Sequence, residues 1–192
     1  VHLKKYLPTN SLIEEFMLLA NKTVAKHLGI IKNKKRPFLY RIHDLPNMEK
    51  LSFLSKLAKQ FGHKVVFSLG KTLPSSLNAL LAKTKNSSEE KIIQNLVASS
   101  MAKAKYTTNN IGHFGLAFPY YSHFTSPIRR YADLVVHRIL KSHFKKTTHT
   151  STIDLESVCK HCSETERTAS SAERDSFKYM QALYFKNKIG EL

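Results

Sequence analysis

Residues 123–134 combine the residue types and spacing in this chain that are best suited to chemistry. They read His-Phe-Thr-Ser-Pro-Ile-Arg-Arg-Tyr-Ala-Asp-Leu, and Ser126 followed by Pro127 is typical of the N-cap and first position of a helix. A helix that begins there directs free backbone N–H groups and its positive dipole end outward. Arg129 and Arg130 lie in the first turn, where cations are disfavoured unless an anion compensates them. The run therefore predicts a site for an anion such as phosphate.

The two arginines cannot share one role, because consecutive helical residues point about 100° apart. We expect one guanidinium to face the anion and the other to face solvent. The structural alternative is an ion pair between Arg129 and Asp133 four residues later, with Arg130 solvated. Spacing alone leaves both interpretations open. The apolar positions expected to face the core on this helix are Ile128, Ala132, Val135 and Ile139.

The composition favours a polyanionic partner. The 192 residues include 31 Lys plus Arg against 14 Asp plus Glu, a formal net charge of +17, which predicts salt-dependent binding to nucleic acid. A lysine-rich surface or an anionic membrane surface is the alternative, but the basic residues are interspersed with apolar periodicity and form no tail. No stretch reaches the ~18 consecutive apolar residues of a membrane span. We expect one globular domain in a cytoplasmic, monomeric protein that does not bind membranes.

The two cysteines are spaced Cys-x-x-Cys, with His161 between Cys159 and Cys162. This pattern occurs in metal and redox sites, but a lone pair is a weak signal. Both cysteines fall on the apolar side of an expected helix, together with Leu155 and Val158. We therefore predict buried, reduced thiols.

Periodicity and capping signals predict an α+β fold that is predominantly helical with a few short strands. Ser11 and Glu14 form a capping-box pattern before a largely buried helix that ends at Gly29. Segment 64–74 is ambiguous between strand and loop, and 147–152 is a polar linker. Further helices are expected over residues 48–61, 75–82, 87–103, from 126 onward and 154–188, and strands over 38–42 and 115–121.

Five sequence words, in this order, resemble the RNB domain of the ribonuclease R and ribonuclease II family. They are Ile-Glu-Glu-Phe-Met-Leu-Leu-Ala-Asn (13–21), Tyr-Arg-Ile-His-Asp (40–44), His-Phe-Gly-Leu-Ala (113–117), the run 123–138 and Ser-Ala-Glu-Arg-Asp (171–175). The wording is more similar to bacterial ribonuclease R than to ribonuclease II. The resemblance implies a hydrolytic, processive 3′→5′ exoribonuclease that degrades single-stranded RNA to nucleoside 5′-monophosphates with Mg²⁺.

The chain departs from this family in its aspartates. The resemblance implies Mg²⁺ held by an aspartate cluster, whereas the four aspartates here are widely scattered: Asp44, Asp133, Asp154 and Asp175. Because the chain also opens on Val1 and closes without an obvious terminating element, we expect residues 1–192 to be the C-terminal portion of an RNB domain. The aspartate cluster is then expected upstream and an OB-type RNA-binding domain downstream. The chain by itself is expected to bind RNA without turnover.

The resemblance assigns two catalytic candidates. Arg129 matches the arginine that contacts the scissile phosphate, and a planar guanidinium can bind two phosphate oxygens and stabilise developing charge. Glu173 matches a glutamate beside the leaving nucleotide; on spacing alone it is equally well a structural ion-pair partner. Glu14 and Glu15 match paired glutamates near the terminal nucleotide. Glu15 is slightly preferred, because Glu14 fits the capping box.

Aromatic residues and further basic residues complete the expected RNA contacts. Arg130, Tyr121 and Tyr131 are RNA-binding candidates, and Tyr120 and Phe124 could stack on bases in the same way, since aromatic faces stack on single-stranded bases. Aromatics in a strand are more often part of a core. The histidines of the family-like words, His113, His123 and His137, are expected to have protein partners and not to bind metal, because Mg²⁺ prefers oxygen ligands.

Three functions remain open at this point. The first is the exoribonuclease, with Arg129 and Glu173 supplied by this chain. The second is a non-catalytic, basic RNA-binding module. The third, and least favoured, is a zinc-bearing helical scaffold that uses Cys159, Cys162 and nearby histidines.

Overall fold

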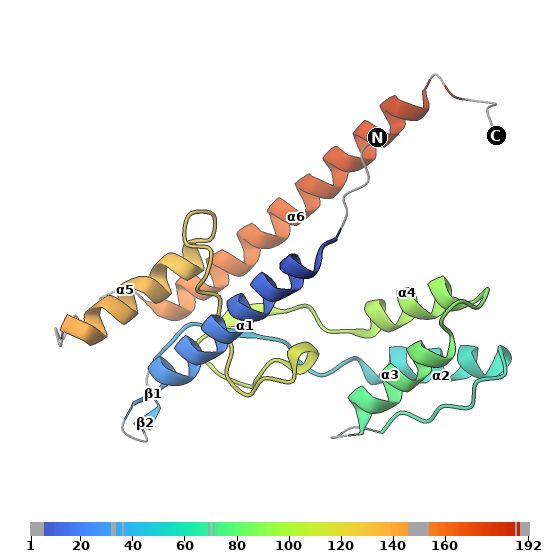
Figure 1. The fold of residues 1–192 in the computed structure, drawn as a ribbon, viewed down its shortest axis with the longest axis horizontal. Coiled ribbons are helices and arrows are strands. Elements are labelled where there is room, and N and C mark those ends of the chain that lie inside the picture. Colours follow the sequence, from blue (N-terminus) through green and yellow to red (C-terminus); the bar gives the residue numbers. More distant parts are fainter. Residues whose placement is uncertain are drawn as a thin grey trace. The chain divides into compact units, whose positions relative to one another are not determined.

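The computed structural model describes residues 6–31, 34–35, 37–68, 70, 72–145, 154–186 and 188 (Figure 1). These residues form two compact units, the first comprising Val1–Ile42 and Lys105–Leu192 and the second His43–Ala104. The expected class is confirmed, because long helices dominate and the described strands are two or three residues long. The expected linker 147–152 lies outside the described residues.

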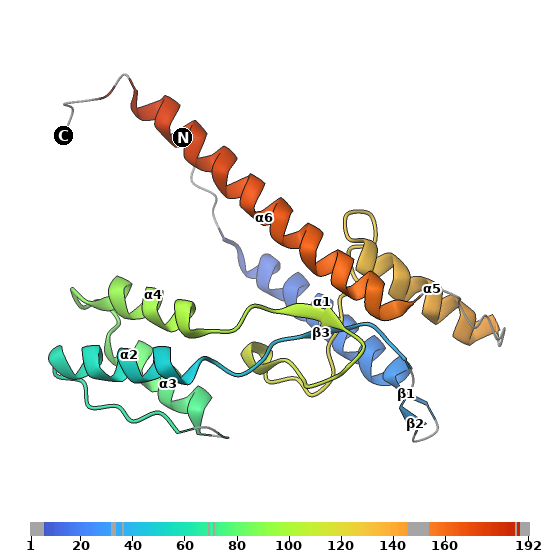
Figure 2. The same ribbon diagram turned by 180° about the vertical axis from the view of Figure 1, so that it is seen from behind.

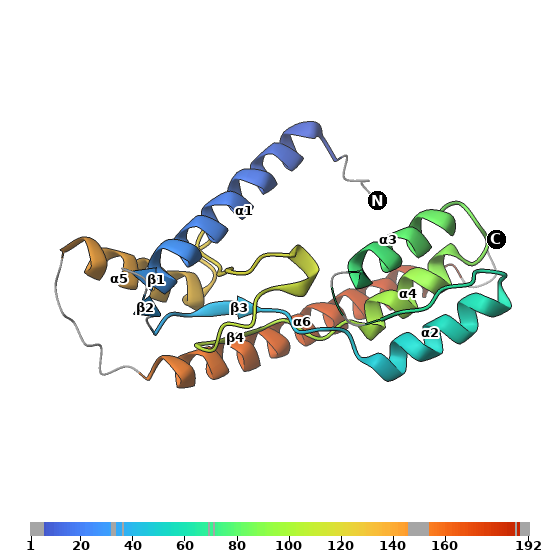
Figure 3. The ribbon, with the colours of Figure 1, turned by 90° about the horizontal axis from the view of Figure 1, so that it is seen from below.

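The first unit places three helices around a small sheet. Helices α1 (Pro8–Gly29), α5 (Tyr131–Lys145) and α6 (Leu155–Phe185) surround strands β3 (Tyr40–Ile42) and β4 (Lys105–Thr107), which pair antiparallel. A second antiparallel pair joins β1 (Ile30–Ile31) to β2 (Lys34–Lys35). Figure 3 shows β4 alongside the N-terminal part of α6. The core of this unit consists of Ala25, Leu28, Phe38, Leu39, Tyr40, Ile42, Tyr106, Ala132, Val135, Val136, Cys159 and Cys162.

The second unit is a group of three helices, α2 (Met48–Gln60), α3 (Leu73–Lys83) and α4 (Glu90–Ser100) (Figure 2). The side chain of Asn47 caps α2 by accepting from the Lys50 N–H at 3.1 Å. The described residues between α2 and α3 contain no strand, so the loop interpretation holds for them, whereas residues 73 and 74 of the ambiguous segment 64–74 belong to α3. The buried side chains of the three helices include Leu51, Leu54, Leu73, Leu77, Leu80 and Ile93.

Helix α1 begins earlier than expected and is much more exposed. It starts at Pro8, and the Asn10 side chain accepts from the Leu7 N–H at 3.1 Å, so the predicted box of Ser11 and Glu14 is wrong. Proline suits a first helical position because its missing N–H would have no helical partner there. Only the second half of α1 contributes buried residues. The exposed apolar side chains of α1 that precede its first buried residue are Leu12, Ile13, Phe16 and Leu19.

The predicted strand over 115–121 is also wrong. This segment contains a short 3-10 helix, Phe114–Leu116, and a single antiparallel bridge between His113 and Phe118. Ala117 adopts a left-handed conformation with φ of 54°, which turns the chain back on itself. The aromatic side chains follow this local turn instead of extending along a sheet.

Helix α6 confirms the predicted long C-terminal helix and its buried thiols. Cys159 and Cys162 are unpaired and buried, and burial raises the pKa of Cys159 to about 12. Ser163 links the helix to β4, because its hydroxyl accepts from the Tyr106 N–H at 2.9 Å. Beyond residue 166 the described part of α6 is exposed, so apolar side chains there, such as Phe177 and Tyr184, do not face a core in this structure.

A partly buried polar network joins both strands to α6 and to the segment before α5. The Tyr106 hydroxyl and His123 Nδ1 share a hydrogen bond of 2.7 Å, and the Arg41 guanidinium lies 4.7 Å from the centroid of the Tyr106 ring. Arg41 also forms two hydrogen bonds with Glu166, of 2.5 and 3.0 Å. Burial, assisted by the nearby Arg130, lowers the pKa of His123 to about 3, so this imidazole is neutral at pH 7.

Acidification should destabilise this chain through His123. In the unfolded state the imidazole binds a proton below its ordinary pKa of about 6.5, whereas the folded state resists protonation down to a pH of about 3. Stability is therefore lost as the pH falls through that window, by up to about 2 kcal/mol between pH 7 and pH 5. Urea unfolding at the two pH values measures this loss. The His123→Gln variant should lose less stability than wild type over the same interval, and an equal loss would contradict the assignment.

Gly29 should be intolerant of a larger side chain. It is the last residue of α1, and a Cβ atom at this position would collide with the Tyr40 hydroxyl. Glycine to alanine in a helix normally stabilises by about 1 kcal/mol, but overpacking here should reverse the sign and cost about 1–3 kcal/mol. Thermal unfolding of Gly29→Ala measures the loss, and the double variant Gly29→Ala/Tyr40→Phe should recover part of it. A more stable single variant would disprove the collision.

Candidate nucleic-acid interface

The two arginines of the 123–134 run lie in a turn that precedes α5. Both the Arg129 and Arg130 N–H groups donate to the Ser126 carbonyl, at 3.4 and 3.1 Å, and the helix begins at Tyr131. The prediction that Ser126 caps a helix starting there is therefore wrong. Ile128 is fully exposed in the turn, whereas Ala132 and Val135 are buried and Ile139 packs against the core. The helical face was predicted correctly only from Ala132 onward.

Asp133, which lies in the first helical turn of α5, stabilises the preceding turn that contains the two arginines. Its carboxylate is 0% exposed, and one oxygen, Oδ2, accepts from the Ser126 N–H and from Arg130 Nη2, both at 2.8 Å. The structure thus contradicts the alternative in which Arg129 pairs with Asp133, because the partner is Arg130 at three residues' separation. An acidic side chain in the first turn also complements the positive end of the helix dipole. Three buried polar atoms of the same region, Thr125 Oγ1, Arg130 Nε and Asp133 Oδ1, have no hydrogen-bond partner among the residues that the structure describes.

Arg129 is left with a free side chain. It is exposed, and within the described residues its guanidinium makes no hydrogen bond or ion pair. The two arginines thus differ in role, as expected from their adjacent positions. The conformation of the turn determines which of them pairs with Asp133 and which faces solvent. Arg130 is a structural ion-pair partner, and Arg129 presents five N–H donors to solvent.

The segment that leads into the turn is anchored to α1 and β3. Asn21, buried on α1, accepts from the Phe124 N–H at 2.9 Å and donates to the Tyr121 hydroxyl at 3.2 Å. The Arg41 N–H donates to the Tyr121 carbonyl at 2.9 Å, and the Ser122 hydroxyl donates to the Leu39 carbonyl at 2.6 Å. These contacts fix the position of Arg129 relative to the core of the first unit.

The aromatic candidates separate into core and surface residues. Tyr121 is 5% exposed, so its ring serves the core and is not available to stack on a base in this structure. Tyr120 is partly buried against the same core. The Phe124 ring stacks on His137 with centroids 4.1 Å apart. Tyr131 is 47% exposed, and the Arg138 guanidinium lies 5.9 Å from its ring centroid.

The acidic candidates lie on the exposed parts of α1 and α6. Glu14 accepts a hydrogen bond of 2.6 Å from the Tyr6 hydroxyl. Glu15 lines a shallow cavity of about 240 Å³ with Leu12, Phe16 and Leu19. Glu173 is exposed on α6. In the described part of the chain none of these three carboxylates forms an ion pair with Arg129, so the structure does not assemble the predicted residues into one contact network.

The three histidines of the family-like words have protein partners. His113 Nδ1 accepts from the Leu116 N–H at 3.2 Å, His123 contacts Tyr106, and His137 Nε2 is 2.9 Å from the Phe124 carbonyl oxygen. The described residues contain no group of three or more His, Cys, Asp or Glu side chains that could hold a metal ion. They therefore do not fit the Mg²⁺ that the resemblance implies, and we assign them no metal-dependent step. Among the same residues, no helix is long and apolar enough to cross a membrane.

Two positioning residues, Asn21 and Asp133, were not predicted as part of the site. Asn21 had a signal in the sequence, because it precedes the buried Ala25 by four residues and so places an amide on the core face of α1. Buried amides need partners, and here the partner is the segment 121–124. Spacing along the helix indicates Asp133 only as an ion-pair partner of Arg129.

Comparison with known proteins assigns this chain to a family. The family model described as "RNB domain" matches residues 1–146. Ribonuclease R of Aquifex aeolicus is 40% identical over 183 residues, which cover 94% of this chain and 25% of that protein. Ribonuclease R of Thermotoga maritima is 40% identical over 191 residues, covering 94% and 26%. The chain thus spans about a quarter of the length of these relatives.

Solved structures show the same fold. Mycoplasma genitalium RNase R in complex with ribose-methylated single-stranded RNA has a TM-score of 0.85 and 30% identity, covering 96% of this chain and 30% of that one. Yeast Ssd1, a pseudonuclease, has a TM-score of 0.65 and 29% identity, covering 79% and 19%. The resemblance inferred from the five sequence words is confirmed by the family match, and the chain belongs to the RNB-domain family.

Proposed function

We propose that the intact protein is a hydrolytic, processive 3′→5′ exoribonuclease that degrades single-stranded RNA to nucleoside 5′-monophosphates. The proposal is supported by ribonuclease R relatives at 40% identity and by the similar Mycoplasma genitalium enzyme, which was solved with single-stranded RNA. The net charge of +17 agrees with a polyanionic substrate. A cytoplasmic location and a monomeric state belong to the same proposal.

The observation that carries this proposal is the free guanidinium of Arg129 beside the fixed guanidinium of Arg130. Because Asp133 neutralises Arg130, the positive charge of Arg129 is the one left for a ligand. A guanidinium binds two oxygens of one phosphate in a planar, bidentate geometry. Its charge can also stabilise the charge that develops on a phosphate during hydrolysis. Arg129 is therefore the group that we propose contacts the scissile phosphate.

The other surface candidates take supporting roles. Tyr131 presents an exposed ring two residues after Arg129, where a terminal base can stack on it. Glu173 and Glu15 are exposed carboxylates, which we assign to the neighbourhood of the leaving nucleotide and the terminal nucleotide, with Glu14 engaged by Tyr6. Mg²⁺ held by an aspartate cluster outside these 192 residues stays a prediction. It would supply the activated water for the hydrolysis.

A non-catalytic RNA-binding module is the second candidate function. It is favoured by one observation, the similarity of the fold to yeast Ssd1, a pseudonuclease. Incubating the intact protein with a labelled single-stranded RNA and Mg²⁺ separates the two functions. Release of mononucleotides from the 3′ end supports the exoribonuclease, whereas binding without any product supports the module.

Replacement of Arg129 by alanine should lower turnover of the intact enzyme by about 10² or more, because a charge-stabilising donor is lost. The melting temperature should change little, since the side chain is exposed and has no partner among the described residues. Arg129→Lys should recover only part of the rate, because an ammonium group cannot make the bidentate contact. Single-turnover kinetics measure the effect. An alanine variant with wild-type turnover would remove Arg129 from the mechanism.

The neighbouring arginine provides the matched comparison. Arg130→Met should leave the buried Asp133 carboxylate without its cation and lower the stability by about 3 kcal/mol or more. Thermal unfolding should therefore give a melting temperature near that of wild type for Arg129→Ala and a lower one for Arg130→Met. Arg129→Ala is thus expected to be stable but inactive, and Arg130→Met to be unstable. Equal melting temperatures would contradict the structural role of Arg130.

A further inference from the structure

The outer face of α5 carries a row of basic residues that the proposed catalytic site does not use. Arg138, Lys141 and Lys145 follow one another at separations of three and four residues, so their side chains lie on one side of the helix. The buried residues Ala132, Val135 and Val136 lie on the other side. The cations are therefore held in line by a helix whose opposite face is packed into the core. We call Arg138, Lys141 and Lys145 the α5 row.

These charges have no protein counter-charge in the described structure. The single acidic residue of α5 is Asp133, which is buried and paired with Arg130. All three side chains of the α5 row are exposed, and none forms an ion pair with a described residue. The helix dipole favours a cation in the last turn and so accounts for Lys145. It does not account for Arg138 in the middle of the helix.

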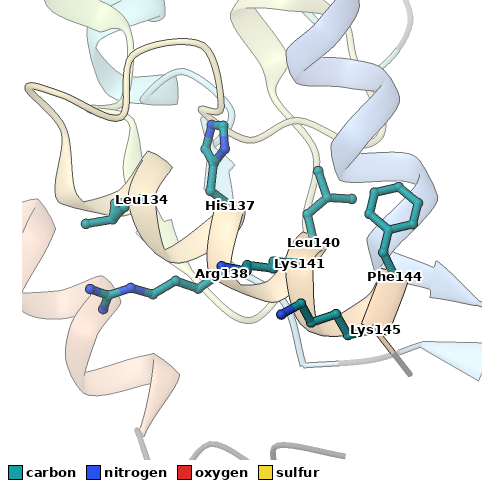
Figure 4. Close-up of a pocket in the computed structure, with 7 residues that line it drawn as sticks. All are labelled: Leu134, His137, Arg138, Leu140, Lys141, Phe144 and Lys145. Carbon is teal, nitrogen blue, oxygen red and sulfur yellow. The ribbon is translucent and has the colours of Figure 1, made fainter. Parts of the chain in front are cut away.

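The row borders a shallow apolar depression. A cavity of about 520 Å³ is lined by Arg138, Lys141, Lys145, Leu134, His137, Leu140 and Phe144. Figure 4 shows that all of these side chains come from α5. Phe144 is 71% exposed at this end of the helix, and Tyr131 is 47% exposed at the other. Arg138 approaches the Tyr131 ring at 5.9 Å, which places a cation and an aromatic face together.

Cations that follow a shallow groove, with exposed aromatic rings near its ends, are the features with which proteins hold single-stranded nucleic acid. The cations bind phosphates and the rings stack on bases without regard to sequence. We propose that the α5 row and Phe144 bind the sugar-phosphate backbone of single-stranded RNA, as a contact separate from Arg129. This inference rests on the proposed function for its ligand. Because Tyr131 adjoins both surfaces, the α5 row would extend the RNA contact along the helix from the Arg129 turn.

Charge reversal tests the α5 row in the intact protein. The variant Arg138→Glu/Lys141→Glu/Lys145→Glu should weaken binding of a fluorescent single-stranded RNA by about tenfold or more, because three phosphate contacts are lost. The slope of log Kd against log salt should fall by about 2, since each single-strand contact contributes about 0.7. Fluorescence anisotropy across a salt series, with chelator present to prevent hydrolysis, gives both quantities. The triple alanine variant replaces the glutamate variant if the latter does not fold.

The control keeps the same change in net charge. Lys56→Glu/Lys59→Glu/Lys91→Glu reverses three exposed lysines of the second unit and should change the affinity by less than about threefold. Phe144→Ala removes the ring without altering charge and should weaken binding by about fivefold or more. If the α5 variant binds RNA with the affinity and salt slope of the lysine control, the inference is wrong. An acidic protein partner would then be the alternative occupant.

The outcomes for the two proposals are separable. Loss of turnover in Arg129→Ala together with control-level binding by the α5 variant would overturn only the present inference. Absence of RNA hydrolysis by the wild-type protein would overturn the exoribonuclease proposal. The binding measurement with chelator does not depend on hydrolysis, so it would still test the α5 row.

Discussion

The interaction on which the candidate site depends is the one between Asp133 and the turn before α5. A fully buried carboxylate that accepts from a backbone N–H and a guanidinium at 2.8 Å fixes Ser126 and Arg130 together. Removing a charge from water is costly, and the attraction of the close partner compensates only while the geometry holds. The pair therefore stabilises one conformation of the turn. As a consequence, Arg129 lies outside the pair and faces solvent with its full charge.

The position of this turn depends in its own right on contacts between segments that are far apart in the sequence. Asn21 of α1 contacts Phe124 and Tyr121, about a hundred residues later, and Leu39 and Arg41 bind the backbone next to them. The neutral His123 hydrogen-bonds Tyr106, whose strand joins α6 through Ser163. Rigid elements thus support a loop that carries the exposed guanidinium. This is the usual way in which folded proteins hold functional groups on loops.

The surface of the first unit carries exposed apolar side chains on α1 and α6 and exposed cations on α5. Helices α1 and α6 were both predicted from the sequence. They carry exposed apolar side chains, such as Leu12 and Phe16 on α1 and Phe177 on α6. The cations of α5 are exposed in the same unit without acidic partners among the described residues. The proteins that this chain resembles include ribonucleases and, by fold, a pseudonuclease.

The amino-acid sequence was sufficient to predict the helical class, the long helix α6, the buried thiols Cys159 and Cys162, and the family, because these depend on periodicity and on short characteristic runs of residues. It also predicted an anion site within residues 123–134, and this site stays a prediction. Only the tertiary structure decided that α5 begins at Tyr131, that Arg130 and not Arg129 pairs with Asp133, and that the ring of Tyr121 is buried. Helix α5 begins later than predicted because the buried Asp133 carboxylate accepts hydrogen bonds from the Ser126 N–H and from Arg130. Sequence spacing cannot decide between an ion pair at a separation of three residues and one at four. The exposure of α1 was likewise undetermined, since an apolar helical face shows in its sequence that it can be buried but not what will cover it.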